Sequence, residues 1–453
     1  MAKIKKIKGR QIFDSRGNPT VEAEVHLDDG SCAFAIVPSG SSTGTHEAFE
    51  LRDLENKKYL GKSVFTAVEN INNKISKALL GLSAYDQFSI DKTLNQLDSS
   101  KEKKILGANA ILASSIATCK AAAIYKKIPL YKHLEELHTD IGSDFVDEDI
   151  PDKYRGFSLP IPLMNVINGG AHANNSLRIQ EFMIRPEKPK SFKHATNICF
   201  LVIQQLKNIL NDNNHATTVG DEGGFAPSLS TNEQAIEFIL KAIEKAKFIP
   251  GEDVSICLDV AANELFKDNK YAVSSSKFIS SKETINYYVD LISKYPIKSI
   301  EDPFQEDDWD TWTEFNKSLK NKKKDNIQIV GDDLFVTNEE RFKKVLNIPS
   351  GQINNREDNP IKIANTILIK PNQIGTLIET LNVINLAQIN GINTIISHRS
   401  GDSEDTFIAD LAVATNSSQI KTGSLARSER VAKYNRLLRI EEELGKHAKM
   451  ANI

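Results

Sequence analysis

The chain has 453 residues, of which 40% are hydrophobic and 26% are charged, a balance typical of a globular protein with a large core. Lys and Arg number 57 and Asp and Glu number 60, so the net charge of -3 gives no electrostatic reason to expect a nucleic acid partner. The four cysteines are widely spaced, with no CxxC pair and no Cys/His cluster, which argues against a disulfide framework or a zinc site and favours a reducing, cytoplasmic location.

The amino-terminal region predicts an antiparallel sheet followed by helices. Residues 20–27 alternate apolar and polar side chains, residues 28–30 form a turn signal, and residues 32–37 return as the partner strand. Helical patterns follow near residues 62–80, 86–98 and 107–128. Strands followed by a run of helices predict an α+β domain over residues 1–138. We find no secretory signal pattern and no apolar stretch long enough to span a membrane.

The second part of the chain alternates short apolar runs with helical patterns. Residues 139–158 are acidic and without periodicity, so we expect a linker there and a separate domain over residues 159–453. The predicted strands are 161–167, 179–184, 254–258, 297–300, 327–330, 366–369, 394–396 and 419–420. The predicted helices lie near 191–211, 234–247, 281–294, 308–320, 373–389, 404–415 and 427–444.

Eight strands with mostly helical crossovers predict an α/β fold, an eight-stranded β/α (TIM-like) barrel with irregularities near its start. A doubly wound open sheet is the alternative. It is weakened because neither a G-x-G-x-x-G nor a G-x-x-x-x-G-K-[ST] motif opens any of the helices.

Charged residues follow six of the predicted strands, each within three positions of the strand's carboxyl end, and in a barrel these strand ends meet at one rim. The first three strand ends carry carboxylates, namely Asp259, Glu301 with Asp302, and Asp332 with Asp333. Oxygen ligands favour a hard ion, Mg²⁺ before Mn²⁺ or Ca²⁺. The next three carry cations, namely Lys370, Arg399 and Lys421. They suit a carboxylate and a phosphate, so the pattern predicts a small, multiply anionic substrate.

Three further segments carry polar residues beside glycines or at a strand position. Glu222 lies in the GDEGG segment (220–224), and Gln180 with Glu181 lies at the predicted strand 179–184; these are acid/base candidates. Residues 38–44 carry hydroxyl groups and glycines but do not form a phosphate-binding loop motif. Ser42 in that loop could reach a phosphate or a metal ion only if the loop covers the barrel rim.

Eight motifs together resemble those of the enolase family, in family order and across nearly the whole chain. They are DSRGNPT (14–20), VPSGSSTG (37–44), NVINGG (165–170), GDEGG (220–224), SIEDPF (299–304), KPNQIG (370–375), SHRSG (397–401) and IKTG (420–423). The resemblance implies the glycolytic, reversible, Mg²⁺-dependent dehydration of 2-phosphoglycerate to phosphoenolpyruvate. It also implies a homodimer, sometimes assembled further.

The resemblance implies a role for each matched residue. Lys370 would take the C2 proton, and Glu222 would protonate the leaving C3 hydroxyl. Two Mg²⁺ ions would be held, the first by the carboxylates that follow the predicted strands, Asp259, Glu301 and Asp332, and the second with the help of Ser42. Lys370 must be neutral to act as a base, so we expect the metal and the neighbouring cations to lower its pKa.

The remaining implied roles concern substrate binding. Gln180 and Glu181 would support the acid end, and His172 would lie on a second closing loop. Arg399 and Ser400 would hold the phosphate beside His398, and Lys421 would hold the carboxylate. Two segments, 139–158 and 347–363, are longer than the family pattern leads us to expect.

Two alternatives compete with this interpretation. A related superfamily member acting on another carboxylate, such as a sugar acid, would lack the loop of Ser42 and the GDEGG motif. A non-catalytic surface role on the same fold, binding plasminogen or extracellular matrix, would be favoured by loss of a metal ligand or of the base, and none is lost. An additional binding role of this kind stays open.

Overall fold

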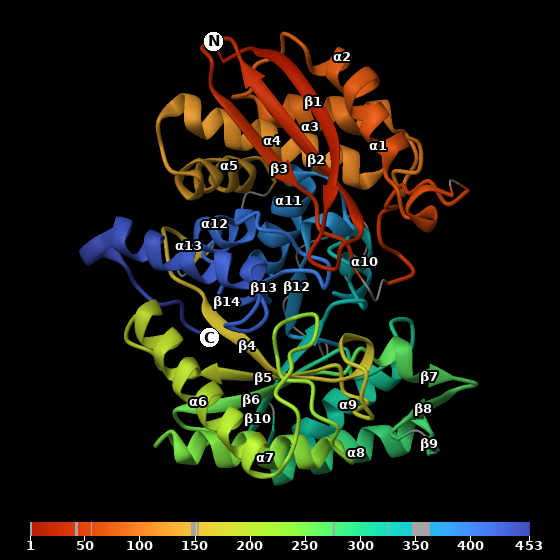
Figure 1. Cartoon of the computed structure of the whole chain (residues 1–453), viewed down its shortest axis with the longest axis vertical. Coiled ribbons are helices and arrows are strands. Elements are labelled where there is room, and N and C mark those ends of the chain that lie inside the picture. The colour runs from red at the N-terminus through yellow and green to blue at the C-terminus, as the bar shows by residue number, and fades with distance from the viewer. Residues whose placement is uncertain are drawn as a thin grey trace.

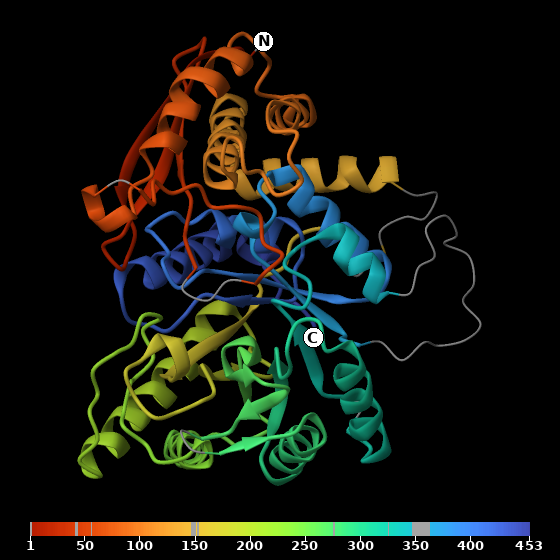
Figure 2. The ribbon, with the colours of Figure 1, turned by 90° about the vertical axis from the view of Figure 1, so that its right-hand side faces the viewer.

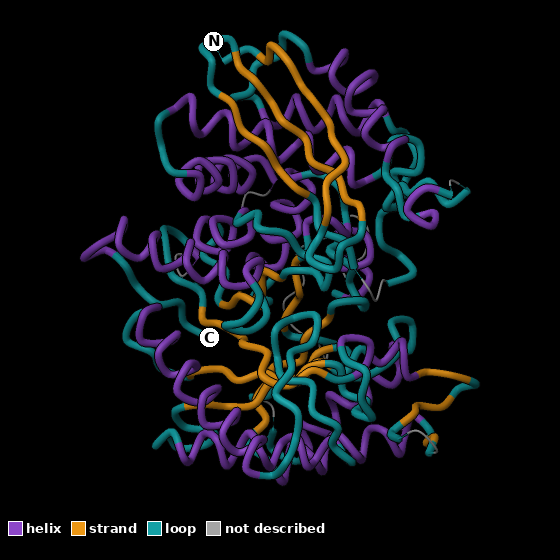
Figure 3. The backbone as a smooth tube through the Cα atoms, in the orientation of Figure 1, coloured by secondary structure: helices purple, strands orange, loops and turns teal. Residues whose placement is uncertain are grey.

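The computed structural model describes residues 2–40, 44–55, 57–145, 151, 154–274, 277–324, 326–346 and 363–453. The amino-terminal sheet and its helices form one layer of the molecule, and the barrel lies below them with helices around its strands (Figures 1 and 3). The predicted segment 347–363 lies, apart from its last residue, outside the described residues.

Three antiparallel strands form the amino-terminal sheet, in the order β1 (Ile4–Phe13), β2 (Pro19–Leu27) and β3 (Cys32–Ile36). Alternate residues of β2, such as Val21 and Val25, are buried in the core, as the period of two predicts. Glu22, on the opposite face of β2, is also buried and pairs with Arg10. The predicted α+β amino-terminal unit is therefore confirmed.

The helices of this unit lie on one side of the sheet (Figure 2). They are α1 (Phe65–Asn70), a π-helical turn (Ile71–Ile75), α2 (Ser76–Leu79), α3 (Gln87–Leu97), α4 (Ala108–Lys126) and α5 (Leu130–Phe145). Helix α4 is alanine-rich and packs against β2 and β3, because small side chains allow a close approach to the sheet. Helix α5 extends through residues 139–145, so the predicted linker was wrong for this stretch.

The second unit is a closed barrel whose hydrogen-bonded order is β10-β11-β12-β13-β14-β4-β5-β6. Its strands are β4 (Ile161–Asn168), β5 (Glu181–Pro186), β6 (Val254–Asp259), β10 (Ile297–Glu301), β11 (Gln328–Gly331), β12 (Thr366–Ile369), β13 (Asn393–Ser397) and β14 (Gln419–Lys421). Strand β5 is antiparallel to both β4 and β6, while the other neighbouring pairs are parallel. The predicted barrel with an irregular start is therefore confirmed.

Helices surround the barrel. They are α6 (Phe192–Asp212), α7 (Asn232–Lys245), α8 (Ser281–Lys294), α9 (Trp309–Asn321), α10 (Glu339–Val345), α11 (Leu377–Ile389), α12 (Phe407–Ala414) and α13 (Ser428–Leu444). Several begin after a Ser or Thr whose side chain accepts a backbone N–H three residues on; these caps are Ser191, Thr231, Ser280 and Thr376. Helix α10 and a small sheet of β7 (Phe266–Lys267), β8 (Lys270–Ala272) and β9 (Phe278–Ile279) were not predicted.

Apolar side chains fill the barrel. One residue from each of six strands forms a buried cluster separate from the main core: Leu163, Met183, Cys257, Val330, Leu368 and Ile395. A filled interior leaves the rim at the strand ends as the place for chemistry. Among the described residues, no helix is long and apolar enough to cross a membrane.

Candidate active site

The carboxyl ends of the barrel strands bring distant charged residues together, as the sequence predicts. Asp259 ends β6, Glu301 ends β10 and Lys421 ends β14, and all three are buried. Lys421 Nζ lies 2.7 Å from an oxygen of Asp259 and 2.9 Å from an oxygen of Glu301. Burial lowers the pKa of Lys421, but the surrounding carboxylates raise it well above its ordinary value. One ammonium group thus balances the charge of several buried acids.

The reversed direction of β5 explains how Glu181 reaches the same place. In an antiparallel strand the amino-terminal end lies at the rim where parallel neighbours end. Glu181 begins β5 and is paired in register with Asp259, and it lies 3.1 Å from Lys421 Nζ. The predicted strand began at residue 179, two positions too early, because the apolar run starts before the hydrogen-bonded strand does.

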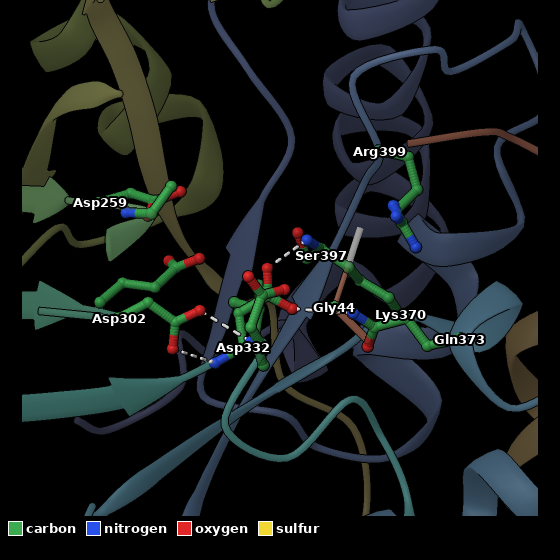
Figure 4. A network of polar contacts seen from close by, with 12 residues as sticks. Gly44, Asp259, Asp302, Asp332, Lys370, Gln373, Ser397 and Arg399 are labelled. Atoms are coloured by element: carbon green, nitrogen blue, oxygen red, sulfur yellow. Dashed lines mark hydrogen bonds and ion pairs between the residues drawn. The ribbon is translucent and has the colours of Figure 1, made fainter. Parts of the chain in front are cut away.

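Asp332 and Lys370 form the next part of the rim (Figure 4). Asp332 follows β11 and Lys370 follows β12, and their charged groups form an ion pair. Gln373 Nε2 donates to the other Asp332 oxygen at 3.0 Å. Burial lowers the pKa of Lys370, but carboxylates around it, Asp332 and then Glu301, raise it and the net direction is upward. Arg399 and Lys421 lower this pKa, as expected, but the neighbouring carboxylates outweigh them.

A compact group of carboxylates lies beside this pair. Oxygens of Asp302, Asp332 and Asp333 lie within 4.8 Å of one another. Asp302 accepts the backbone N–H groups of Asp332 at 2.9 Å and Asp333 at 2.7 Å, which orders the turn after β11. Burial and then the neighbouring acids raise the pKa of Asp302 and of Asp333. Sequence reasoning noted both residues at strand ends but gave them no role.

A second group of acids lies at the other side of the rim. Side-chain atoms of His172, Glu181 and Glu222 lie within 4.8 Å of one another. Asn165 Nδ2 donates to both carboxylates, at 3.1 Å to Glu181 and 3.3 Å to Glu222. His398 Nε2 lies 3.2 Å from Glu222. Two of the predicted acid/base candidates, Glu181 and Glu222, therefore share one buried network.

The two carboxyls of this network titrate in opposite directions. Burial and the charge of Glu222 raise the pKa of Glu181 well above its ordinary value. For Glu222 burial also favours a raised pKa, but His172, His398 and the Arg430 guanidinium hold the pKa well below its usual range. Burial lowers the pKa of His398 to about 4. A proton shared by the pair is therefore favoured on Glu181 in the free protein.

The cationic end of the rim is built around Arg399. The guanidinium is buried and binds Glu47 through both terminal nitrogens, at 2.9 and 3.2 Å, and Asn372 at 3.1 Å. Arg430, which sequence reasoning missed, donates to His398 Nδ1 and to the carbonyl oxygen of Arg399, both at 2.6 Å. Arg430 lies on α13, outside every quoted motif, so no local signal identifies it.

Many of these residues line one small cavity. Its lining residues are His172, Gln180, Glu181, Glu222, Asp259, Lys370, Ser397, His398, Arg399, Ser400 and Lys421. Among the predicted residues, Glu301 and Asp332 lie beside this lining rather than in it, and Ser42 lies outside the described residues. A small substrate in the cavity would contact cations from β12, β13 and β14 and carboxyls from β5 and β6.

The amino-terminal unit contributes to the rim through the segment around residue 40. Ser39 pairs with Gly401 as an isolated bridge, and its hydroxyl donates to Asp14 at 3.0 Å. At Gly44 a Cβ atom would lie 2.7 Å from Val336 and 3.2 Å from Asp333 Oδ1, so a larger residue would displace these groups. Both ends of the predicted loop are therefore held against the barrel.

Comparisons with known proteins agree with the fold and the site. Residues 4–134 match the enolase N-terminal domain, and residues 156–453 match the enolase C-terminal TIM barrel domain. The chain is 58% identical over 453 residues to the enolase of Pelagibacter ubique (strain HTCC1062), with the whole of both chains covered. The chain therefore belongs to the enolase family and is a lyase of the phosphopyruvate hydratase class, as the sequence predicted.

Proposed function

We propose that this protein catalyses the reversible, Mg²⁺-dependent dehydration of 2-phosphoglycerate to phosphoenolpyruvate. One observation carries the proposal: a lysine and a pair of acids, from separate segments of the chain, line the same small cavity. Eliminating water in two steps needs a base at C2 and an acid at the C3 hydroxyl, addressing different sides of the substrate. Lys370 and the Glu181/Glu222 pair are suited to these two tasks.

Lys370 is the proposed base. Its ammonium pairs with Asp332, which favours the protonated form. A cation held by Asp332 would offset that carboxylate's charge and so favour the neutral amine. Gln373 binds the same carboxylate from the other side, so the pair is held in position.

Glu222 is the proposed acid at the C3 hydroxyl. The proton is favoured on Glu181, whose carboxyl shares Asn165 with Glu222, so the two acids can act as one proton reservoir. His172 lies 3.7 Å from Glu222 and 3.8 Å from Glu181. We assign Gln180 and His172 to positioning the leaving group at this end.

The donor set fits a hard divalent cation. Asp259, Glu301 and Asp332 are buried carboxylates at the carboxyl ends of three neighbouring strands, and burial followed by Coulombic repulsion from the other two raises the pKa of Glu301. Buried like charges of this kind favour a bound cation. These three would hold the first Mg²⁺, and Ser42 would help to hold a second. Bound Mg²⁺ would stabilise the negative charge that develops on the substrate carboxylate.

Arg399 and Lys421 would bind the two anionic groups of the substrate. Arg399 and Ser400 would bind the phosphate, with His398 beside them, because guanidinium and hydroxyl groups suit phosphate oxygens. Lys421 would bind the carboxylate on which charge develops, next to Asp259 and Glu301. The predicted homodimer, cytoplasmic location and possible plasminogen binding stay predictions.

One assay tests the substrate, the reaction and the metal together. It follows the absorbance of the phosphoenolpyruvate product after addition of 2-phosphoglycerate, with and without Mg²⁺. We expect the absorbance to rise only when 2-phosphoglycerate and Mg²⁺ are both present. Chelation with EDTA should stop the rise, and readdition of Mg²⁺ should restore it. A rise of equal rate in EDTA would overturn the metal dependence, and no rise under any condition would overturn the reaction.

A further inference from the structure

Glu47 binds the guanidinium of Arg399, the residue that we propose binds the phosphate. The sequence analysis assigns no role to Glu47. Its two carboxylate oxygens accept separate hydrogen bonds from the two terminal nitrogens of Arg399. This bidentate pairing is the arrangement by which Arg also binds phosphate. The Glu47 side chain is 10% exposed and that of Arg399 is 2% exposed, so the pair is shielded from water.

Glu47 is held in place by other parts of the site. It accepts the backbone N–H of Gly44 at 3.0 Å, and Gln373 Nε2 lies at 3.4 Å. The next residue, Ala48, donates its N–H to the carbonyl oxygen of Gln373 at 2.8 Å. The carboxylate is therefore fixed between the phosphate end of the cavity and the turn that carries Lys370, and it is not a chance surface contact.

We propose that Glu47 is the internal counter-anion of Arg399, with which the phosphate of the substrate must compete. This inference rests on the proposed function of the site. A buried guanidinium without an anion is costly, so Glu47 keeps it buried and oriented before substrate arrives. The same carboxylate weakens phosphate binding, because two anions then share one fork. Glu47 thereby sets how tightly substrate and product are held.

Titration of inorganic phosphate into the full-length protein, followed by calorimetry at fixed Mg²⁺, tests this. Glu47→Gln keeps an oxygen that can accept from Gly44 but removes the charge. We expect the dissociation constant for phosphate to fall about tenfold, the scale of one charge-assisted hydrogen bond. The KM for 2-phosphoglycerate should fall with it, whereas a merely structural defect would raise KM.

Glu306→Gln is the matched control. Glu306 is a buried carboxylate that accepts from Thr45 in the same segment but makes no described contact with Arg399. It should disturb the anchoring of the segment without tightening phosphate binding. Glu47→Asp, which keeps the charge, should stay within about threefold of the wild type. If Glu47→Gln does not fold, Glu47→Ala should give the same tightening.

Unchanged or weaker phosphate binding in the folded Glu47→Gln protein would overturn the proposal, as would equal tightening in Glu306→Gln or Glu47→Asp. Failure of the proposed function is distinguishable. A wild-type protein that binds phosphate but turns over no 2-phosphoglycerate would refute the dehydration, while the phosphate titration would still report on Glu47.

Discussion

Replacing Lys421 by methionine tests the cation site without measuring turnover. Lys421 is buried and lies within 3.1 Å of oxygens from Asp259, Glu301 and Glu181. Lys421→Met keeps the volume and leaves these acids without their ammonium partner. Breaking a buried ion pair in this way costs about 3–5 kcal/mol of unfolding free energy. We expect a loss of that size when Mg²⁺ is chelated.

Mg²⁺ should recover much of this loss, because a cation bound by Asp259 and Glu301 replaces the missing charge. Binding at a hundredfold excess over the dissociation constant contributes about 2.7 kcal/mol. The competing ammonium is absent in Lys421→Met, so the gain on adding Mg²⁺ should be larger in this variant than in the wild type. Urea unfolding curves of the wild type and of Lys421→Met, in EDTA and in Mg²⁺, measure the loss of unfolding free energy and its recovery.

Lys433→Met is the matched control. Lys433 is equally buried and lies 2.7 Å from Asp402, but it makes no described contact with the proposed metal ligands. Its loss should destabilise the protein by a similar amount that Mg²⁺ does not recover. If Mg²⁺ stabilised the two variants to the same extent, or gave Lys421→Met no extra gain, the assignment of Asp259 and Glu301 as ligands would be refuted.

Further predictions concern the chemistry and the pH dependence of stability. Lys370→Ala should abolish exchange of the C2 proton of 2-phosphoglycerate with deuterated solvent. Glu222→Gln should retain this exchange but lose dehydration. Equal loss of exchange and dehydration in both variants would show that the roles of base and acid are wrongly assigned to Lys370 and Glu222. Asp259→Asn should weaken Mg²⁺ binding measured by calorimetry, and an unchanged titration would mean that this carboxylate is not a ligand. Burial lowers the pKa of His138 to about 4 in the folded protein. Between about pH 6.5 and 4 this histidine is therefore protonated in the unfolded chain but not in the folded protein. The stability of the folded protein falls as the pH falls through this window. The loss between pH 7 and pH 5 is about 2 kcal/mol, and urea unfolding of His138→Gln should show a correspondingly shallower decline; an identical decline in the variant would contradict the assignment.

Local patterns were enough to find the barrel strands and most of the rim. Buried strands such as β6 and β12 are mostly apolar, so each was located within a residue of its ends. The charged residue that follows a strand was then placed at the rim by the topology alone. The sequence did not predict helix α5 and placed a linker over its last turn, where the helix formers are weak, although Leu134, Leu137 and Ile141 bury one face of the helix.

The sequence by itself determined the order of the elements, the family and the side chains that supply the chemistry, because these depend on periodicity and on motifs of a few neighbouring residues. Only the tertiary structure decided which of those side chains meet. The reversed β5 brings Glu181 beside Asp259, and carboxylates around Lys370, Asp332 and then Glu301, help to turn the net direction of its pKa upward. Glu47 and Arg399 are 352 positions apart and their pairing leaves no local pattern, because charge interactions depend on distance in space and not along the chain.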